Sequence, residues 1–226
     1  MKRFISLIVT LFTLTSLSAQ EKEFLAPFTA LDIDAHVQLK LVKIQEHEAP
    51  YIIYDTKGAE NTKFIFNIKN KTLKVRERHD SKRQSITEVT IGFTSLTDIS
   101  IAKADTKVEG ILTSQLLDLY ISNDANLIAE VDVLDIMSHV SGKSRVELYG
   151  YTRYHTAEVS SARYNAHELH SVSTIVESSH NAIARVSADE RLEAKTNTGG
   201  KVYYRIQPTL LRSRITAFGG EITRIK

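Results

Sequence analysis

Two short stretches decide the fold: Asn123-Asp124-Ala125-Asn126-Leu127 and Gly142-Lys143-Ser144-Arg145-Val146. In each stretch a cluster of small or polar residues is followed by one polar residue and then by an apolar anchor. The anchors are Leu127 and Val146, and the difference between their numbers (146 − 127) is 19. An outward polar residue beside an inward apolar one is what a strand with one buried face requires. The repetition therefore predicts that successive strands bury their anchors side by side.

The same pattern occurs seven times between residue 96 and the end of the sequence. The clusters are Ala104-Asp105-Thr106, Asn123-Asp124-Ala125, Gly142-Lys143-Ser144, Ser160-Ser161-Ala162, Ser178-Ser179-His180, Thr198-Gly199-Gly200 and Phe218-Gly219-Gly220. The anchors are Val108, Leu127, Val146, Tyr164, Ala182, Val202 and Ile222, and subtraction of successive numbers gives 19, 19, 18, 18, 20 and 20. A period near this length, built of strand and small-residue corner, is typical of stacked coils. We therefore predict an all-β protein whose residues 96–226 form a single-stranded β-helix, or β-solenoid.

An antiparallel meander remains the alternative architecture, because pairs of hairpins can repeat at a similar interval. The solenoid is favoured because the period keeps its phase over the whole segment. A left-handed coil of hexapeptides would place an apolar residue at every sixth position. Steps of six from Val146 give Thr152, Glu158 and Tyr164, which argues against that version.

The first part of the chain alternates apolar and polar residues as strands do. Leu31–Ala35 and Val37–Leu41 are two such segments, and Asn70-Lys71 joins Phe64–Ile68 to Leu73–Arg76 in a predicted hairpin. No segment has the periodicity of an amphipathic helix. We predict an N-terminal β region at 20–95 stacked on the solenoid at 96–226.

The beginning of the chain, at 1–19, is typical of an export signal. Lys2 and Arg3 precede a short apolar run, and Leu17-Ser18-Ala19 offers small residues for cleavage. The run is shorter than the roughly 20 residues that span a bilayer, so no transmembrane segment is predicted in the mature chain. We expect an exported protein of the periplasm, the outer membrane or the extracellular space.

Charge and cysteine content exclude several classes of function. The 29 basic and 27 acidic side chains become 27 and 27 once Lys2 and Arg3 are removed. A neutral mature chain has no long-range field to attract nucleic acid, so nucleic-acid binding is disfavoured. The absence of cysteine excludes disulfides, Cys-ligated zinc and a thiol nucleophile.

Tyrosines and arginines of two neighbouring predicted coils are the strongest binding candidates. The six residues are Tyr149, Tyr151, Tyr154, Arg145, Arg153 and Arg163. Aromatic residues with Arg are enriched at recognition surfaces and can stack on sugars. Tyr164 lies among them, but as an anchor it is expected to fill the core.

Catalytic and metal sites find less support in the sequence. There is no Gly-x-Ser-x-Gly elbow, so no catalytic residue is assigned. His167 and His170 are three positions apart, which on a strand points them to opposite faces. We therefore expect the histidines to be solvated surface residues, with no metal and no cofactor. Asp105 and Asp124 share a position in the predicted repeat, which would place their carboxylates about 5 Å apart, most simply as a solvated pair.

The last predicted coil needs a cover, because an open solenoid edge invites pairing with another chain. Either Gln207–Arg214 folds over this coil, or the coil forms a contact between copies of the chain.

Corner motifs give the sequence a family resemblance. They are Gly58-Ala59-Glu60-Asn61, Asn70-Lys71-Thr72-Leu73-Lys74-Val75, the repeats, and Phe218-Gly219-Gly220-Glu221-Ile222. With these motifs the chain resembles, over residues 28–225, the head GIN domain family of exported bacterial proteins, common in Bacteroidetes and labelled auto-transporter adhesins. Only Gly199-Gly200 and Gly219-Gly220 keep the glycine doublets of that family. The resemblance implies one continuous β-helix-like domain and a cell-envelope location, and it brings no catalytic residues.

Two functions follow as expectations. The favoured one is a non-enzymatic envelope or surface protein that binds a glycan, a protein or its own copies through an extended β surface. The alternative is a carbohydrate-active enzyme of the β-helix type, a polysaccharide lyase or hydrolase, whose site would need clustered acidic residues.

Overall fold

The computed structural model describes residues 21–58, 63–78, 85–216 and 218–225. The predicted signal sequence at 1–19 lies outside these ranges. About 70% of the chain is strand and the described residues contain no helix, so the predicted all-β class is confirmed.

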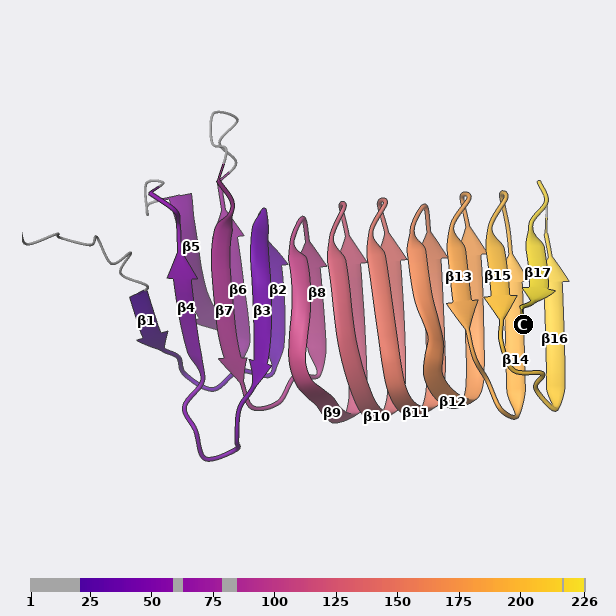
Figure 1. The fold of residues 1–226 in the computed structure, drawn as a ribbon, viewed down its shortest axis with the longest axis horizontal. Coiled ribbons are helices and arrows are strands. Elements are labelled where there is room, and N and C mark those ends of the chain that lie inside the picture. The colour runs from indigo at the N-terminus through magenta and orange to yellow at the C-terminus, as the bar shows by residue number, and fades with distance from the viewer. Residues whose placement is uncertain (1–20, 59–62, 79–84, 217, 226) are drawn as a thin grey trace, which may run out of the picture.

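The predicted winding is also confirmed, because consecutive long strands lie parallel and side by side (Figure 1). These strands are β9 (Asp105–Ser122), β10 (Asn126–Ser141), β11 (Arg145–Ser160) and β12 (Arg163–Ser179). Each one passes through a bend, so that its first half lies in one layer and its second half in the facing layer. We call these the first layer and the second layer. About seven turns of solenoid span residues 98–224, which excludes the antiparallel meander.

The last coils have the same path, but each bend separates two shorter strands. The first layer continues with β13 (Ile183–Val186), β15 (Lys201–Tyr204) and β17 (Glu221–Arg224). The second layer continues with β14 (Arg191–Thr196) and β16 (Leu210–Ile215). All of these pairings are parallel.

The register corrects two of the seven predicted anchors. The aligned inward column of the first layer is Thr106, Leu127, Val146, Tyr164, Ala184, Val202 and Ile222. Val108 therefore stands two positions after the true anchor of its coil, and Ala182 two positions before. In each coil the anchor stands two positions after the residue that closes the turn. Ala182 is such a closing residue, because its N–H donates to the Ser179 carbonyl at 3.0 Å.

The turns between coils depend on left-handed backbone conformations. Gly142 and Lys143 both have positive φ, at 64° and 67°, as a type I′ turn requires. The turns also bond to one another: the Asp124 N–H donates to the Gly142 carbonyl at 2.8 Å, and the Lys143 N–H to the Ser161 carbonyl at 2.7 Å. The backbone hydrogen-bond ladder thus continues around the corner from coil to coil.

The N-terminal strands are stacked on the solenoid, as predicted, but not in chain order. They are β1 (Glu21–Phe24), β2 (Ala30–Asp34), β3 (Val37–Lys43), β4 (Tyr51–Asp55), β5 (Phe64–Lys69), β6 (Thr72–Glu77), β7 (Thr87–Phe93) and β8 (Asp98–Ala102). Strand β2 pairs in parallel with both β6 and β8, and β3 pairs in parallel with both β7 and β9. Two facing strands such as β2 and β3 form one level of the stack, which we call a rung. The β2–β3 rung therefore lies between the β6–β7 rung and the β8–β9 rung (Figure 1).

Antiparallel strands cover the N-terminal end of the stack. Strand β4 lies against β7, β1 lies against β4, and β5 forms the predicted hairpin with β6. The hairpin turn residues Asn70 and Lys71 have φ of 53° and 58°, again a type I′ geometry. An antiparallel strand at the end interrupts the parallel stacking direction and separates the N-terminal coil edge from solvent.

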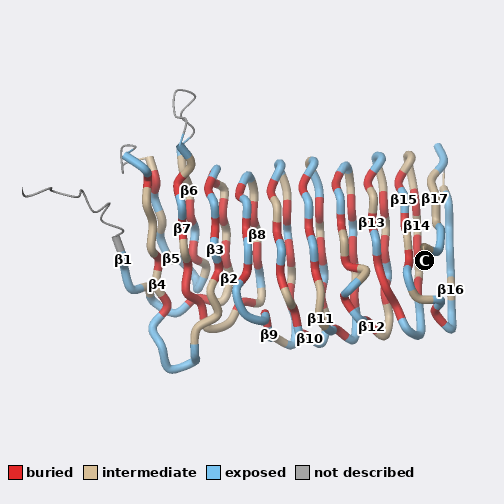
Figure 2. Tube along the Cα trace, in the orientation of Figure 1, coloured by how far each residue is buried: buried red, intermediate tan, exposed pale blue. Residues whose placement is uncertain are grey.

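One hydrophobic core runs along the stack, from Ile52 in β4 to Val202 in β15 (Figure 2). Buried and exposed residues alternate along the strands, as a two-layer solenoid with solvent on both outer faces requires. The expectation that Gln207–Arg214 folds over the last coil is wrong. Residues 210–215 form β16, which pairs with β14 as part of the last coil instead of folding across it.

Candidate functional site

The structure does not bring the six predicted binding residues together at one place. Arg145 and Arg163 are register partners at the starts of β11 and β12, beside the turns. Tyr149 stands four residues further along β11, which is about 13 Å at the rise of a strand. Tyr151 and Arg153 are exposed at the bend of β11, and Tyr154 follows on the outer face of the second layer. The two beginning-of-strand arginines therefore do not share a site with Tyr151.

The bends create a groove along one edge of the solenoid, which we call the bend-edge groove. It has a volume of about 590 Å³. Its lining comes from five successive coils: Ser114, Asp132, Val133, Leu134, Tyr151, Thr152, Arg153, Val172 and Glu190. In Figure 1 this edge is the lower one, opposite the turns. The groove exists because every long strand changes layer at this edge.

Tyr151 is the main aromatic surface of the bend-edge groove. Its side chain is 64% exposed. Its ring stacks on the His170 ring of the next coil, with centroids 5.4 Å apart and planes 20° apart. Arg153 lies over the Tyr154 ring, 5.7 Å from its centroid. The stacking fixes the orientation of an exposed ring, which reduces the entropy cost of binding against it.

Polar groups line other parts of the same groove. Asp132 and Glu190 are exposed carboxylates of the groove, and Ser114 adds a hydroxyl. Carboxylates accept hydrogen bonds, whereas the Arg153 guanidinium only donates them. A flat aromatic surface with both donors and acceptors nearby is suited to a polyhydroxylated ligand, whose hydroxyls both donate and accept.

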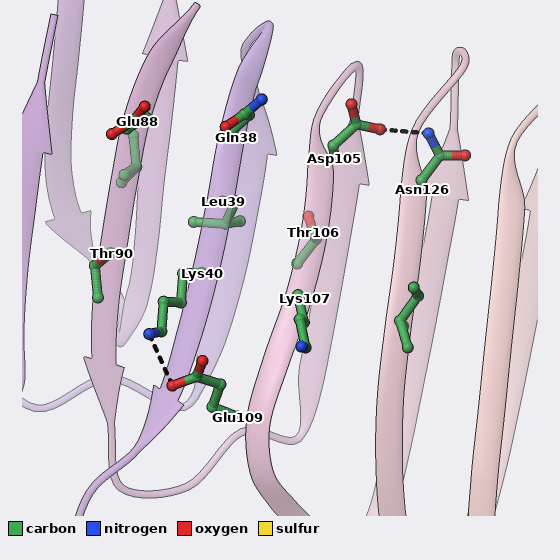
Figure 3. A pocket seen from close by; sticks show the side chains of 12 residues that line it. Gln38, Leu39, Lys40, Glu88, Thr90, Asp105, Thr106, Lys107, Glu109 and Asn126 are labelled. Carbon is green, nitrogen blue, oxygen red and sulfur yellow. Dashed lines mark hydrogen bonds and ion pairs between the residues drawn. The ribbon is translucent and has the colours of Figure 1, made fainter.

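A second groove, of about 530 Å³, lies on the first layer across β7, β3, β9 and β10 (Figure 3). One row of side chains crosses these four strands in register, in the order Glu88, Gln38, Asp105, Asn126. Asn126 donates a hydrogen bond to Asp105, and Lys40 forms a 2.9 Å ion pair with Glu109. Lys40 and Glu109 neutralise one another, and the residues that line this groove include no aromatic side chain. We therefore regard the bend-edge groove as the candidate site.

The structure corrects the expectation for the two aspartates. Asp105 is aligned with Asn126 in β10, while Asp124 stands in the preceding turn. They do not share a column, so the acidic pair does not exist. His170 stacks on Tyr151 and His167 bonds to Asn165 at 2.5 Å, so the two histidines have different partners. Among the residues that the structure describes, no group of three or more His, Asp or Glu side chains could hold a metal ion.

The expectation of surface histidines is wrong for His155, which is 1% exposed. Its Nε2 lies 2.7 Å from the Tyr164 hydroxyl, which donates to Ser138 at 3.1 Å, and its Nδ1 lies 3.5 Å from the Thr174 hydroxyl. Burial lowers the pKa of His155 from 6.5 to about 4 and raises that of Tyr164, so both are neutral at pH 7. The signal was present in the sequence: His155 has the same parity as the inward residues Ala157 and Val159.

The stacked coils, the two-layer core and the surface grooves together define the class of the protein: a flattened, single-stranded β-solenoid with an N-terminal strand cover. The family model described as "Putative auto-transporter adhesin, head GIN domain" matches residues 27–208. The chain therefore belongs to the head GIN domain family, which confirms the resemblance found in the corner motifs.

Solved structures of three bacterial proteins have the same fold. A "putative adhesin" of Bacteroides fragilis is 17% identical, with a TM-score of 0.84 over 92% of this chain and 96% of that one. A "putative adhesin" of Parabacteroides merdae is 13% identical, with a TM-score of 0.73 over the same shares. A "putative lipid binding protein" of Parabacteroides distasonis is 13% identical, with a TM-score of 0.60 over 93% and 98%.

A search of curated protein sequences finds no match. Within the described ranges, no helix is both long enough and apolar enough to cross a bilayer.

Proposed function

We propose that this chain is an exported, non-enzymatic binding protein of the bacterial cell envelope or surface, and that it holds a glycan in the bend-edge groove. The observation that carries the proposal is the exposed Tyr151 ring, held by His170 and bordered by Arg153 and two carboxylates. The family description and the adhesin names of the two solved structures support a role in binding at the surface.

The chemistry of the groove favours a sugar. A pyranose ring has an apolar C–H face that packs on an aromatic ring, and its hydroxyls need both donors and acceptors at the rim. Tyr151 supplies the first, while Arg153 and Asp132 supply the second. The groove also runs along successive coils, so it can follow an extended chain of sugars.

Export is supported by the sequence alone. The predicted signal at 1–19 and the absence of cysteine suit a chain that folds outside the cytoplasm without disulfides. The periplasm, the outer membrane and the extracellular space all remain within this proposal.

One feature of the groove favours the enzyme alternative: it contains two exposed carboxylates, Asp132 and Glu190. Glycoside hydrolysis uses a pair of carboxyl groups, one with a raised pKa. The binding role is preferred because Asp132 and Glu190 come from coils three steps apart, about 14 Å at the spacing of stacked strands, whereas the carboxyl pair of a glycosidase is separated by less than about 10 Å.

The test is titration calorimetry of the mature protein with a panel of envelope and host polysaccharides. We expect a ligand that binds wild type and binds Tyr151→Ala about fivefold more weakly, since such stacking contributes on the order of 1 kcal/mol. Tyr120→Ala is the matched control, because Tyr120 is an exposed tyrosine that also stacks on a histidine, His139, at 4.9 Å.

Two results would contradict the proposal. Equal weakening by Tyr151→Ala and Tyr120→Ala would place the ligand elsewhere. New reducing ends released from a polysaccharide by wild type, but not by Asp132→Asn or Glu190→Gln, would establish the enzyme alternative.

A further inference from the structure

The last coil presents two strand edges that face away from the solenoid. Strand β16 pairs with β14 on one side, and β17 pairs with β15 on one side. Within the described ranges, no strand pairs with the far side of either. In Figure 1 these two strands form the end of the stack opposite β1.

The direction of each backbone group on β16 follows from the hydrogen bonds at its two ends. The Leu210 N–H donates to the Glu190 carbonyl at 2.8 Å, and the Thr216 N–H donates to the Thr196 carbonyl at 2.9 Å. Consecutive residues of a strand direct their N–H and C=O groups to alternate sides. Residues of even number therefore bond to the preceding coil, and Leu211, Ser213 and Ile215 direct their N–H and C=O groups outward.

The inward side chains of this coil are only half covered. Ile215 is 55% exposed, although its partner Thr196 in the preceding coil is fully buried. Leu211 and Ile222 pack on the core but are only partly buried. A further strand on β16 would cover Leu211 and Ile215 and would bond to three outward-directed residues at once.

The charge on this edge specifies what kind of strand fits. Strands β16 and β17 carry Arg212, Arg214 and Arg224 but only one acidic residue, Glu221. Glu221 already accepts hydrogen bonds from Tyr203 at 3.0 Å and from Thr223 at 3.1 Å. Among the described residues, neither Arg214 nor Arg224 has an ion-pair partner, whereas Arg212 bonds to Glu193 at 3.1 Å. The edge thus has a surplus of positive charge.

We propose that β16 binds an extended acidic segment of a partner protein, which adds to the sheet as one more strand. Apolar side chains of that segment would lie over Leu211 and Ile215, and acidic side chains would lie beside Arg212 and Arg214. Main-chain hydrogen bonds give the affinity of such strand addition, and alternate side chains give its specificity.

A second copy of this chain fits the edge less well. Antiparallel pairing of β16 with itself, with the apolar residues kept inward and in the two registers of greatest overlap, sets Arg212 opposite Arg212 or Arg214 of the other copy. Like charges directly opposite one another on paired strands are destabilising. An acidic segment instead gains from the same arginines.

The test uses a variant that blocks only the outer edge of β16. Ser213→Pro removes an N–H that points away from the solenoid and is not part of the ladder to β14, so proline is tolerated there as on other edge strands. Ser213→Ala keeps the N–H and is the matched control. Circular dichroism and the melting temperature establish that both variants fold as wild type does.

The probe is a short acetylated peptide in which Glu alternates with Val, labelled for fluorescence anisotropy, with a Lys–Val peptide as its counterpart. We expect the acidic peptide to bind wild type and Ser213→Ala equally and to bind Ser213→Pro about tenfold more weakly, which corresponds to one charge-assisted or main-chain hydrogen bond. Arg214→Glu should also weaken binding, and added salt should weaken it further.

Three results would overturn the proposal. The acidic peptide would bind no more tightly than the Lys–Val peptide, or Ser213→Pro would bind as wild type does. Alternatively, light scattering would show a dimer of wild type that Ser213→Pro abolishes, which would assign the edge to a second copy.

Discussion

The two halves of the molecule build the same kind of rung in different chain order. In the solenoid each strand lies beside the next one in sequence, and aligned residues are 18 to 21 positions apart, as in Val146 with Tyr164 and Asp105 with Asn126. In the N-terminal region Gln38 is aligned with Glu88 and with Asp105, which are 50 and 67 positions away (88 − 38 and 105 − 38). Stacking thus depends on matched inward side chains and an available edge, and not on sequence order.

This difference gives the β2–β3 rung a special position. Both of its neighbours, the β6–β7 rung and the β8–β9 rung, come later in the sequence. Among the described rungs, no other lies between two later ones. The β6–β7 rung reaches the rest of the stack through it. The inward side chains of the β2–β3 rung are therefore covered on both sides, whereas those of the last coil are covered on one side only.

The largest effect should separate these two positions. Leu41 is fully buried between Ile91 and Val108, so Leu41→Ala should lower the free energy of unfolding by about 3 kcal/mol. Ile222 on the last coil is only partly buried, so Ile222→Ala should cost about 1 kcal/mol. Urea unfolding of both variants measures the difference. Equal losses would mean that the β2–β3 rung is no better covered than the end of the stack.

Acid should affect the solenoid through His155. The pKa of His155 is about 4 in the folded protein and 6.5 when exposed, so between these pH values the unfolded chain binds a proton that the folded chain does not. The contribution of this residue to stability is therefore constant above pH 6.5 and falls as the pH is lowered towards 4. The loss at pH 5 is about 2 kcal/mol.

The measurement is the free energy of unfolding of wild type and His155→Leu at pH 7.5 and pH 5. On going from pH 7.5 to pH 5, wild type should lose about 2 kcal/mol more free energy of unfolding than His155→Leu does. Val159→Ala provides the control, because Val159 is a buried residue of the same strand and its replacement removes no ionisable group. An identical pH dependence in wild type and His155→Leu would show that His155 is not buried.

The smallest effect should come from the turns that keep the solenoid in chain order. Lys143 has a φ of 67°, which costs a non-glycine residue about 1 kcal/mol, so Lys143→Gly should raise stability by up to that amount. Gly142→Ala should lower it, because the new Cβ would lie 2.9 Å from the Asn123 nitrogen. Thermal unfolding of the two variants measures both signs, and a shift of the same sign in both would refute the turn geometry.

The sequence predicted the solenoid because its coils repeat. Leu127 and Val146 recur at a nearly constant interval, and the turns between them need small residues or residues that tolerate positive φ. The sequence placed the anchors of two coils at Val108 and Ala182, two positions from the true ones. The alternation of inward and outward residues repeats every two positions, so it does not distinguish these two registers. The buried residue that closes each turn, such as Ala125 or Ser144, is a sharper marker of the phase.

The position of β2–β3 could not be predicted in this way. Leu31, Ile33, Leu39 and Leu41 have the alternation of a rung, but alternation records which side of a strand is buried and not which strand lies beside it. The candidate site was predicted in part for a similar reason. Tyr151 and Arg153 were identified, but strand positions alone did not show that a bend separates them from Arg145 and brings them near Glu190.

The stacking order can be tested directly, because the chain has no cysteine of its own. Cysteine pairs are introduced at Glu88, Gln38 and Asp105, which lie in one row (Figure 3), and are treated with a short reagent that bridges two thiols. Adjacent strands are about 4.8 Å apart, so the pairs Gln38→Cys with Glu88→Cys and Gln38→Cys with Asp105→Cys should both be bridged, while Glu88→Cys with Asp105→Cys should not. Efficient bridging of positions 88 and 105, with none between 38 and 105, would mean that the rungs follow chain order and would contradict this account.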